Sequence, residues 1–202
     1  MLGKYLDPIN SRGVILASGS VGRAMICEKI GLQANIVVSG FPEDRSWKDF
    51  ESPQEYAIFN ARQKSASVLS EKVVITADTI IALDGEVFEK PVDRNDLVRM
   101  MRAFSGKSHL LITAVVVKGI IVQEAIEVTE MHVDELSEDA IQCIADSPGE
   151  WETHSGGYSI DAKFGATIFT KINGDYYNII GLPANRLGKM LIAEHLEWEK
   201  NT

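Results

Sequence analysis

A carboxylate at the end of an apolar run is the sharpest chemical feature of this sequence of 202 residues. Asp78 directly follows residues 73–77, which have the length and the β-branching of a buried strand. A carboxylate in such a place is costly unless it pairs with a cation or binds a metal ion. Lys90 follows at the end of the hairpin that Asp78 begins. A plain Asp78–Lys90 ion pair and a ligand site at the end of the strand both explain this pattern.

A turn of small residues follows the first apolar run, residues 14–17, and it offers a second kind of chemistry. Ser18, Gly19 and Ser20 let the backbone approach a ligand closely, and Arg23 supplies paired N–H donors for a phosphate. The turn lacks the GxxxxGK[ST] pattern of a Walker A loop. A tight turn that only joins a strand to a helix explains the same residues about as well.

Two further charged residues complete a possible phosphate site. Lys64 falls on the same helical face as Ala61 and Val68, where it either extends its ammonium to water or uses it inside the protein. Glu43 lies in a polar loop after the second predicted strand, and by itself it reads as a solvated loop residue. Together with Asp78 and the basic residues, it provides the minimum set for metal-assisted chemistry on phosphate esters or anhydrides.

Composition and missing motifs exclude several other functions. The chain carries 20 Lys and Arg against 29 Asp and Glu, a formal charge of −9, which argues against binding to duplex nucleic acid. It has no HExxH, GxSxG or GxGxxG motif. Its two cysteines form no CxxC pair, its start carries charge and proline, and its apolar stretches are too short for a membrane span. We therefore expect a cytoplasmic protein that does not enter a membrane.

The elements that must position these residues alternate between helix and strand. Five helices are predicted. The first spans residues 23–32, three begin after the caps Ser52, Asp93 and Ser137, and the last begins at Pro183. The helix after Ser137 ends before Pro148-Gly149. The predicted strands cover residues 14–17, 35–39, 73–83, 86–89, 109–118 and 120–133, with a strand-like segment over residues 156–180. Asp84-Gly85 predicts a tight hairpin turn. The pattern indicates an α/β protein with a mixed sheet, in a single domain over residues 1–202 that has possibly two lobes.

Seven segments in this order resemble the Maf-like nucleoside triphosphate pyrophosphatases. They run from residue 15 to about residue 191 and read LASGSxxR, FPED, ARQKSASVL, ITADTIIALDGEVFEKPVD, FSGKSHLLIT, SGGYSID and GDYYNIIGLP. The ADT, EKP and GDYYNIIGLP segments are specific in their order and spacing. The FPED loop and the SPQEYA segment after it look more similar to eukaryotic members of the family.

The resemblance implies a fold, an activity and a cofactor. The fold would be an elongated α/β domain with a central twisted mixed sheet flanked by helices and a cleft between two lobes, often assembled as a homodimer. The activity would be hydrolysis of a nucleoside triphosphate, with a pyrimidine or modified base, to the monophosphate and pyrophosphate. A divalent metal, Mg²⁺, Mn²⁺ or Co²⁺, would assist it. The family is read as housecleaning of the nucleotide pool, and no motif of this chain names the base.

The resemblance also assigns roles residue by residue. Water would attack the α-phosphorus, with Asp78 and Glu43 holding the metal or activating the water. Lys64, Lys90 and Arg23 would neutralise charge on the phosphates, beside the turn of Ser18 and Ser20. Asp161 stands where the family has a glutamine of the substrate site.

Two departures from the family pattern keep alternatives open. Val21-Gly22 replaces the family's Pro-Arg, so that one of two arginines is missing. For Asp161 two effects stay open, repulsion of a triphosphate and recruitment of a metal. Ser159 and Ala162 also replace glycines. A nucleotide-binding protein of Maf-like fold with weak or no turnover is therefore the main alternative. The related inosine triphosphate pyrophosphatases, which prefer purines, fit the motifs less well.

Overall fold

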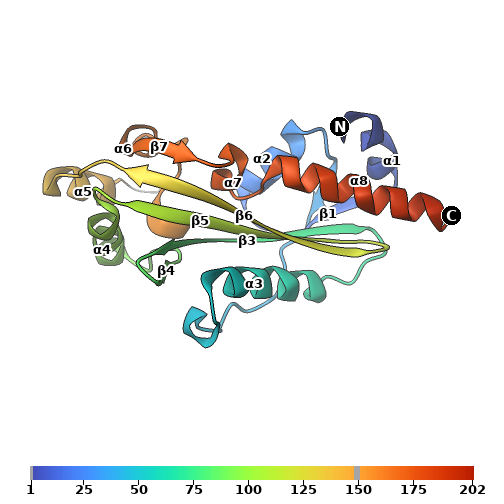
Figure 1. Ribbon diagram of the computed structural model, residues 1–202, viewed down its shortest axis with the longest axis horizontal. Coiled ribbons are helices and arrows are strands. Elements are labelled where there is room, and N and C mark those ends of the chain that lie inside the picture. The colour runs from blue at the N-terminus through green and yellow to red at the C-terminus, as the bar shows by residue number, and fades with distance from the viewer. Residues whose placement is uncertain (1, 148–150) are drawn as a thin grey trace. The chain divides into compact units, whose positions relative to one another are not determined.

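A mixed β-sheet organises the computed structural model, which describes residues 2–147 and 151–202 (Figure 1). Its strand order is β2-β1-β3-β5-β6-β7, with β4 paired to β3. The strands are β1 (Val14–Leu16), β2 (Ala34–Ile36), β3 (Val73–Leu83), β4 (Glu86–Phe88), β5 (Ser108–Lys118), β6 (Val122–Val133) and β7 (Phe169–Asn173). β1 is parallel to β2 and β3, whereas β4 and β7 run antiparallel to β3 and β6. The predicted α/β fold with a mixed sheet is confirmed.

Short polar side chains cap several of the helices. The helices are α1 (Leu6–Ser11), α2 (Val21–Lys29), α3 (Pro53–Ser67), α4 (Arg94–Phe104), α5 (Glu138–Ala145), α6 (Gly165–Ile168), α7 (Tyr176–Ile180) and α8 (Ala184–Lys200), with 3-10 turns at Leu2–Tyr5, Trp47–Asp49 and Ser155–Gly157. The predicted caps Ser52, Asp93 and Ser137 each accept the N–H three residues on. Pro148 and Gly149, predicted to follow α5, lie outside the described residues. No helix in the described ranges is long and apolar enough to cross a membrane.

The chain's contacts divide it into two units. The first holds the residues up to Asp78, Thr113–Glu127 and the residues from Gly181 onward; the second holds Thr79–Ile112 and Val128–Ile180. β3 therefore belongs to the first unit as far as Asp78 and to the second from Thr79 on. The single domain over residues 1–202 and the cleft between its lobes stay predictions.

In the first unit, α3 and α8 lie on opposite sides of the strands (Figure 1). α8 is tied to the N-terminal segment by a buried ion pair, because Arg12 donates from Nη1 and Nη2 to the two Glu194 oxygens at 2.7 and 2.9 Å. The Ile120 N–H also donates to Glu194 Oε1, at 3.0 Å. A side chain at Gly119 would collide with this carboxylate, which explains the glycine in the β5–β6 turn.

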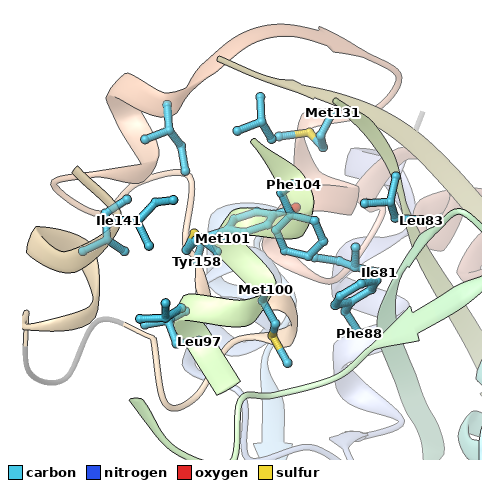
Figure 2. Close-up of a cluster of buried hydrophobic side chains, with 14 of the residues drawn as sticks. Ile81, Leu83, Phe88, Leu97, Met100, Met101, Phe104, Met131, Ile141 and Tyr158 are labelled. Atoms are coloured by element: carbon cyan, nitrogen blue, oxygen red, sulfur yellow. The ribbon is translucent and has the colours of Figure 1, made fainter. Parts of the chain in front are cut away.

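In the second unit, an apolar cluster joins the β3–β4 hairpin to α4, α5 and β6 (Figure 2). Its α4 members, Leu97, Met100, Met101 and Phe104, recur at helical spacing and are all buried. The hairpin turns at Asp84 and Gly85, whose φ values of 52° and 82° are the left-handed conformation predicted for this dipeptide. Burial of each large side chain contributes roughly 1.5–3 kcal/mol, so this cluster dominates the stability of the unit.

The prediction of strand over residues 156–180 is largely wrong. β7 occupies five residues of the segment, and the others lie in a 3-10 turn, in α6, in α7 or in the irregular stretches 158–164 and 174–175. Asp175 Oδ1 accepts the N–H groups of Tyr177 and Asn178, which starts α7 after the Gly174 turn. Helices of four and five residues are too short to show a 3.6-residue period, so apolar and aromatic content was mistaken for strand.

Candidate functional site

Asp78 lies at the centre of a buried charged cluster in the first unit. Its side chain is 7% exposed, and the Lys64 Nζ lies 2.6 Å from its Oδ1. The same Nζ lies 3.1 Å from Glu43 Oε1, whose side chain is 44% exposed. Asn60, 1% exposed, donates from Nδ2 to Asp78 Oδ2 at 3.3 Å. One ammonium thus joins two carboxylates, one buried and one open to water.

The position of the cluster follows from how α3 packs on β3. Ala57 and Ala61 are fully buried, and their small side chains let the helix approach the strand closely. Thr76 Oγ1 donates to the Ala61 carbonyl at 2.8 Å and adds a buried hydrogen bond between the two elements. Asn60 and Lys64 are one helical turn apart, so both reach Asp78. The alternative of a Lys64 ammonium extended to water is wrong, because the ammonium pairs with protein carboxylates.

The two serines of the predicted phosphate turn have partners within the turn. Ser20 caps α2 by accepting the Arg23 N–H at 3.4 Å. Ser18 Oγ accepts the Ser20 N–H at 3.2 Å and Arg23 Nη1 at 3.1 Å. α2 consequently begins two residues earlier and ends three residues earlier than predicted, because Ser20 is its cap and Gly31 turns to a φ of 80°.

Arg23 connects this turn to β3 and to the segment before α8. Its Nε donates to the Gly181 carbonyl at 2.9 Å, and its Nη1 donates to the Ala77 carbonyl at 2.8 Å. Burial lowers the pKa of Arg23, and the charges of Asp78 and Glu43 oppose that shift. The guanidinium therefore brings positive charge next to Asp78 and, through Ala77, holds the middle of β3. The strand runs on to Leu83, so Asp78 does not lie at the end of its strand as the apolar run predicts.

The residues of this cluster fit a magnesium-like ion that also binds substrate. Mg²⁺ uses one or two protein carboxylates together with waters and substrate phosphates. Glu43 and Asp78 are two such carboxylates, and they converge on one cation, the Lys64 ammonium. Within residues 2–147 and 151–202, no group of three or more His, Cys, Asp or Glu is arranged to hold a metal. Two carboxylates match the number of protein ligands that Mg²⁺ takes when it also binds phosphate, and the divalent metal stays a prediction.

Two of the predicted site residues, Lys90 and Asp161, belong to the second unit. Lys90 is exposed, and the backbone beside it is fixed, because Gly156 N–H donates to the Glu89 carbonyl at 2.8 Å. Asp161 is exposed and accepts the Tyr176 hydroxyl at 2.6 Å, which raises the pKa of Tyr176 to about 12. Their place in one site with Asp78 stays a prediction.

Three participants in the first unit were not predicted from the sequence. One of them is the side chain of Asn60. Its helical spacing could have indicated it, since it precedes Lys64 by four residues on one helical face. The other two are the carbonyls of Ala77 and Gly181 that hold Arg23. No side-chain pattern identifies backbone acceptors, so the sequence offered no signal for them.

Comparison of the sequence with known proteins identifies a family and several relatives. The model of the family described as "Maf-like protein" matches residues 13–194. A "dTTP/UTP pyrophosphatase" of Pyrococcus furiosus is 35% identical over 90% of this chain and 95% of its own length. A protein of the same name from Schizosaccharomyces pombe is 33% identical over 94% and 86%. A human "Probable bifunctional dTTP/UTP pyrophosphatase/methyltransferase protein" is 33% identical over 95% of this chain, which spans 33% of the human protein.

Proposed function

The chain belongs to the Maf-like protein family, and from that premise we propose that it hydrolyses a nucleoside triphosphate to the monophosphate and pyrophosphate. Its relatives from Pyrococcus furiosus and Schizosaccharomyces pombe are named for dTTP and UTP, which makes pyrimidine nucleotides the proposed substrates. The observation that carries the proposal is the cluster of Glu43, Lys64 and Asp78. Two carboxylates and an ammonium meet there next to Arg23, which is the charge arrangement that phosphoryl chemistry requires.

In the proposed reaction, a water oxygen attacks the α-phosphorus and the bond to the β-phosphate oxygen breaks, so that pyrophosphate leaves. Asp78 would accept the proton of the attacking water, as a general base within a buried site. Lys64, Lys90 and Arg23 would neutralise the negative charge on the phosphate oxygens. The small residues Ser18, Gly19 and Ser20 would let the phosphates approach the backbone.

Glu43 and Asp78 are the residues that would hold a divalent ion, Mg²⁺, Mn²⁺ or Co²⁺. Such an ion supplies charge neutralisation and polarisation of phosphate oxygens when it is bound. Glu43 is open to water and can turn toward an incoming ion, while Asp78 stays in its buried position. We therefore expect activity to depend strongly on a divalent ion, since the chain as a whole is acidic.

The experiment is pyrophosphate release from a panel of nucleoside triphosphates with Mg²⁺, Mn²⁺ or Co²⁺ and with EDTA. Asp78→Asn should lower kcat by about 10²–10⁴-fold, the range for removal of a general base. Asp84→Asn is the matched control, because it makes the same chemical change at an exposed carboxylate that pairs with Lys107. Undiminished turnover in Asp78→Asn would remove the assignment of the base.

A nucleotide-binding protein without turnover is the second candidate, favoured by Gly22 where the family has an arginine. It predicts that the wild-type chain binds a triphosphate in calorimetry yet releases no pyrophosphate with any of the three metals. A preference for purine triphosphates in the same panel would instead support the inosine triphosphate pyrophosphatase class. The cytoplasmic location and the homodimer stay predictions, which fractionation and light scattering would check.

A further inference from the structure

We propose that Asn60 is the positioning residue that fixes the carboxylate of Asp78. The inference deepens the proposed function, on which its kinetic test rests. Each Asp78 oxygen has its own partner, since Oδ1 accepts from Lys64 at 2.6 Å and Oδ2 accepts from Asn60 at 3.3 Å. A carboxylate can only accept, so the amide nitrogen of Asn60 is the donor. Two donors on opposite oxygens define the plane of the carboxylate, which one donor does not.

Asn60 and Lys64 differ in how firmly they are held. Lys64 carries a point charge on a flexible four-carbon stem, and its ammonium is shared with the exposed Glu43. A phosphate that approaches the site therefore competes for that ammonium. Asn60 has a short side chain, is 1% exposed and lies on a helix packed against the strand of Asp78. It keeps its bond to Asp78 while Lys64 turns toward the substrate.

This placement assigns Asn60 a role that a packing residue would not need. An amide in the interface of α3 and β3 is costly unless it is hydrogen-bonded, and an apolar side chain of similar size would fill the same volume. Hydrogen-bond partners of a reactive or metal-binding carboxylate typically change activity or metal affinity by about 10–100-fold when they are removed. The inference concerns orientation, so its effect belongs to the chemical step and not to nucleotide binding.

The test compares Asn60→Leu with a matched control in the same interface. Thr76→Val removes the buried hydrogen bond from Thr76 to the Ala61 carbonyl, between the same helix and strand, and leaves the Asp78 carboxylate untouched. Asn60→Leu should lower kcat for the preferred nucleotide by about 10–100-fold with KM changed less than threefold. Thr76→Val should lower the melting temperature to a similar extent and keep kcat within twofold of the wild type.

Crystal structures of the two variants provide a measurement that needs no activity. In Asn60→Leu the Asp78 carboxylate should rotate or occupy more than one orientation, and in Thr76→Val it should keep the orientation of the wild type. An unchanged, single orientation in Asn60→Leu overturns the proposal, as does an equal loss of kcat in both variants. If the wild-type chain hydrolyses no nucleotide, the proposed function fails and the orientation of Asp78 alone decides the role of Asn60.

Discussion

Two buried ion pairs in the first unit use opposite arrangements. Arg12 and Glu194 bond through both oxygens, and a backbone N–H completes the coordination of the carboxylate, which is fully buried. Lys64 and Asp78 share a single contact, and the ammonium is divided between Asp78 and the exposed Glu43. In the first pair, both carboxylate oxygens have fixed hydrogen-bond donors within the protein. The second pair has a partner at the surface that solvent or a ligand can replace.

The difference shows what distinguishes a structural ion pair from one available for chemistry. Burial and charge are common to both, so neither property alone indicates a site. The informative property is whether every donor and acceptor already has a fixed partner. Arg12 joins the N-terminal segment to α8 and has no freedom to exchange, while Lys64 can pass from one carboxylate to another anion.

Exchange of each cation for methionine should separate stability from activity, and this is the largest expected effect. Arg12→Met leaves the Glu194 carboxylate buried without a counter-charge and should lower the free energy of unfolding by about 3–5 kcal/mol. Lys64→Met should cost less, about 1–3 kcal/mol, because Asp78 keeps the Asn60 N–H and Glu43 regains water. Urea unfolding followed by tryptophan fluorescence measures both.

Activity should respond in the opposite order. Lys64→Met should abolish most pyrophosphate release, whereas Arg12→Met should leave kcat near the wild-type value at temperatures where it is folded. A variant pair in which Arg12→Met loses more kcat than Lys64→Met would contradict the distinction between the two ion pairs.

A neutral pair in the second unit extends the comparison to pH. His109, 2% exposed, lies 2.5 Å through its Nε2 from the Tyr158 hydroxyl, and Figure 2 shows Tyr158 beside Met101 and Phe104. Burial, with a smaller effect of His132, lowers the pKa of His109 to about 4. Between about pH 6.5 and pH 4, His109 is therefore protonated in the unfolded chain and neutral in the folded chain.

Stability should consequently fall as the pH drops through this window, by on the order of 3 kcal/mol from His109 alone. The contribution is complete above pH 6.5 and is lost toward pH 4. His109→Gln keeps a hydrogen-bonding side chain without the titration, so its free energy of unfolding should decline less steeply over the same range. Equal slopes for the two proteins would show that His109 does not carry the effect.

Replacing a glycine by alanine should have different consequences in the two units. These variants have the smallest expected effects on the free energy of unfolding. Gly156 has a φ of 72°, and a Cβ there would collide with Ile81, so Gly156→Ala should cost about 2 kcal/mol. A Cβ on Gly19 would meet Val38 at an ordinary 3.6 Å. Gly19→Ala should change the free energy of unfolding by less than about 0.5 kcal/mol and should raise KM for the nucleotide.

Thermal melts and steady-state kinetics of both variants check this expectation. Unchanged KM in Gly19→Ala would show that the phosphates do not approach the backbone of this turn.

Much of the fold could be predicted because its signals are local. The buried strands show β-branched runs, and the caps Ser52, Asp93 and Ser137 precede helices with visible periodicity. α6 and α7 could not be predicted, because helices of four and five residues show no repeated pattern and depend on tertiary packing. β2 ends three residues before its predicted end, since beyond Ile36 its neighbour β1 has ended.

The charged residues of the site could be predicted from the sequence, but the ion pairs that they form could not. Asp78 and Arg23 were found from residue type and place, Lys64 was left open between two explanations, and Glu43 was assigned through the family resemblance. The structure brings these four together in the first unit. The partner that Asp78 takes, Lys64 instead of Lys90, depends on the packing of α3 on β3. Asn60 was overlooked because an amide in a helix matches neither an apolar nor a charged pattern.

β3 has a consequence for the synthesis of the protein. Its eleven residues, VVITADTIIAL, are almost all buried, and Asp78 is the one charged residue in that run. Before the sheet forms, such a segment has the composition of an aggregation-prone strand, and a central charge opposes self-association. We therefore expect Asp78 to oppose aggregation of the unfolded chain, with a larger insoluble fraction from Asp78→Leu than from Asp78→Glu at equal expression.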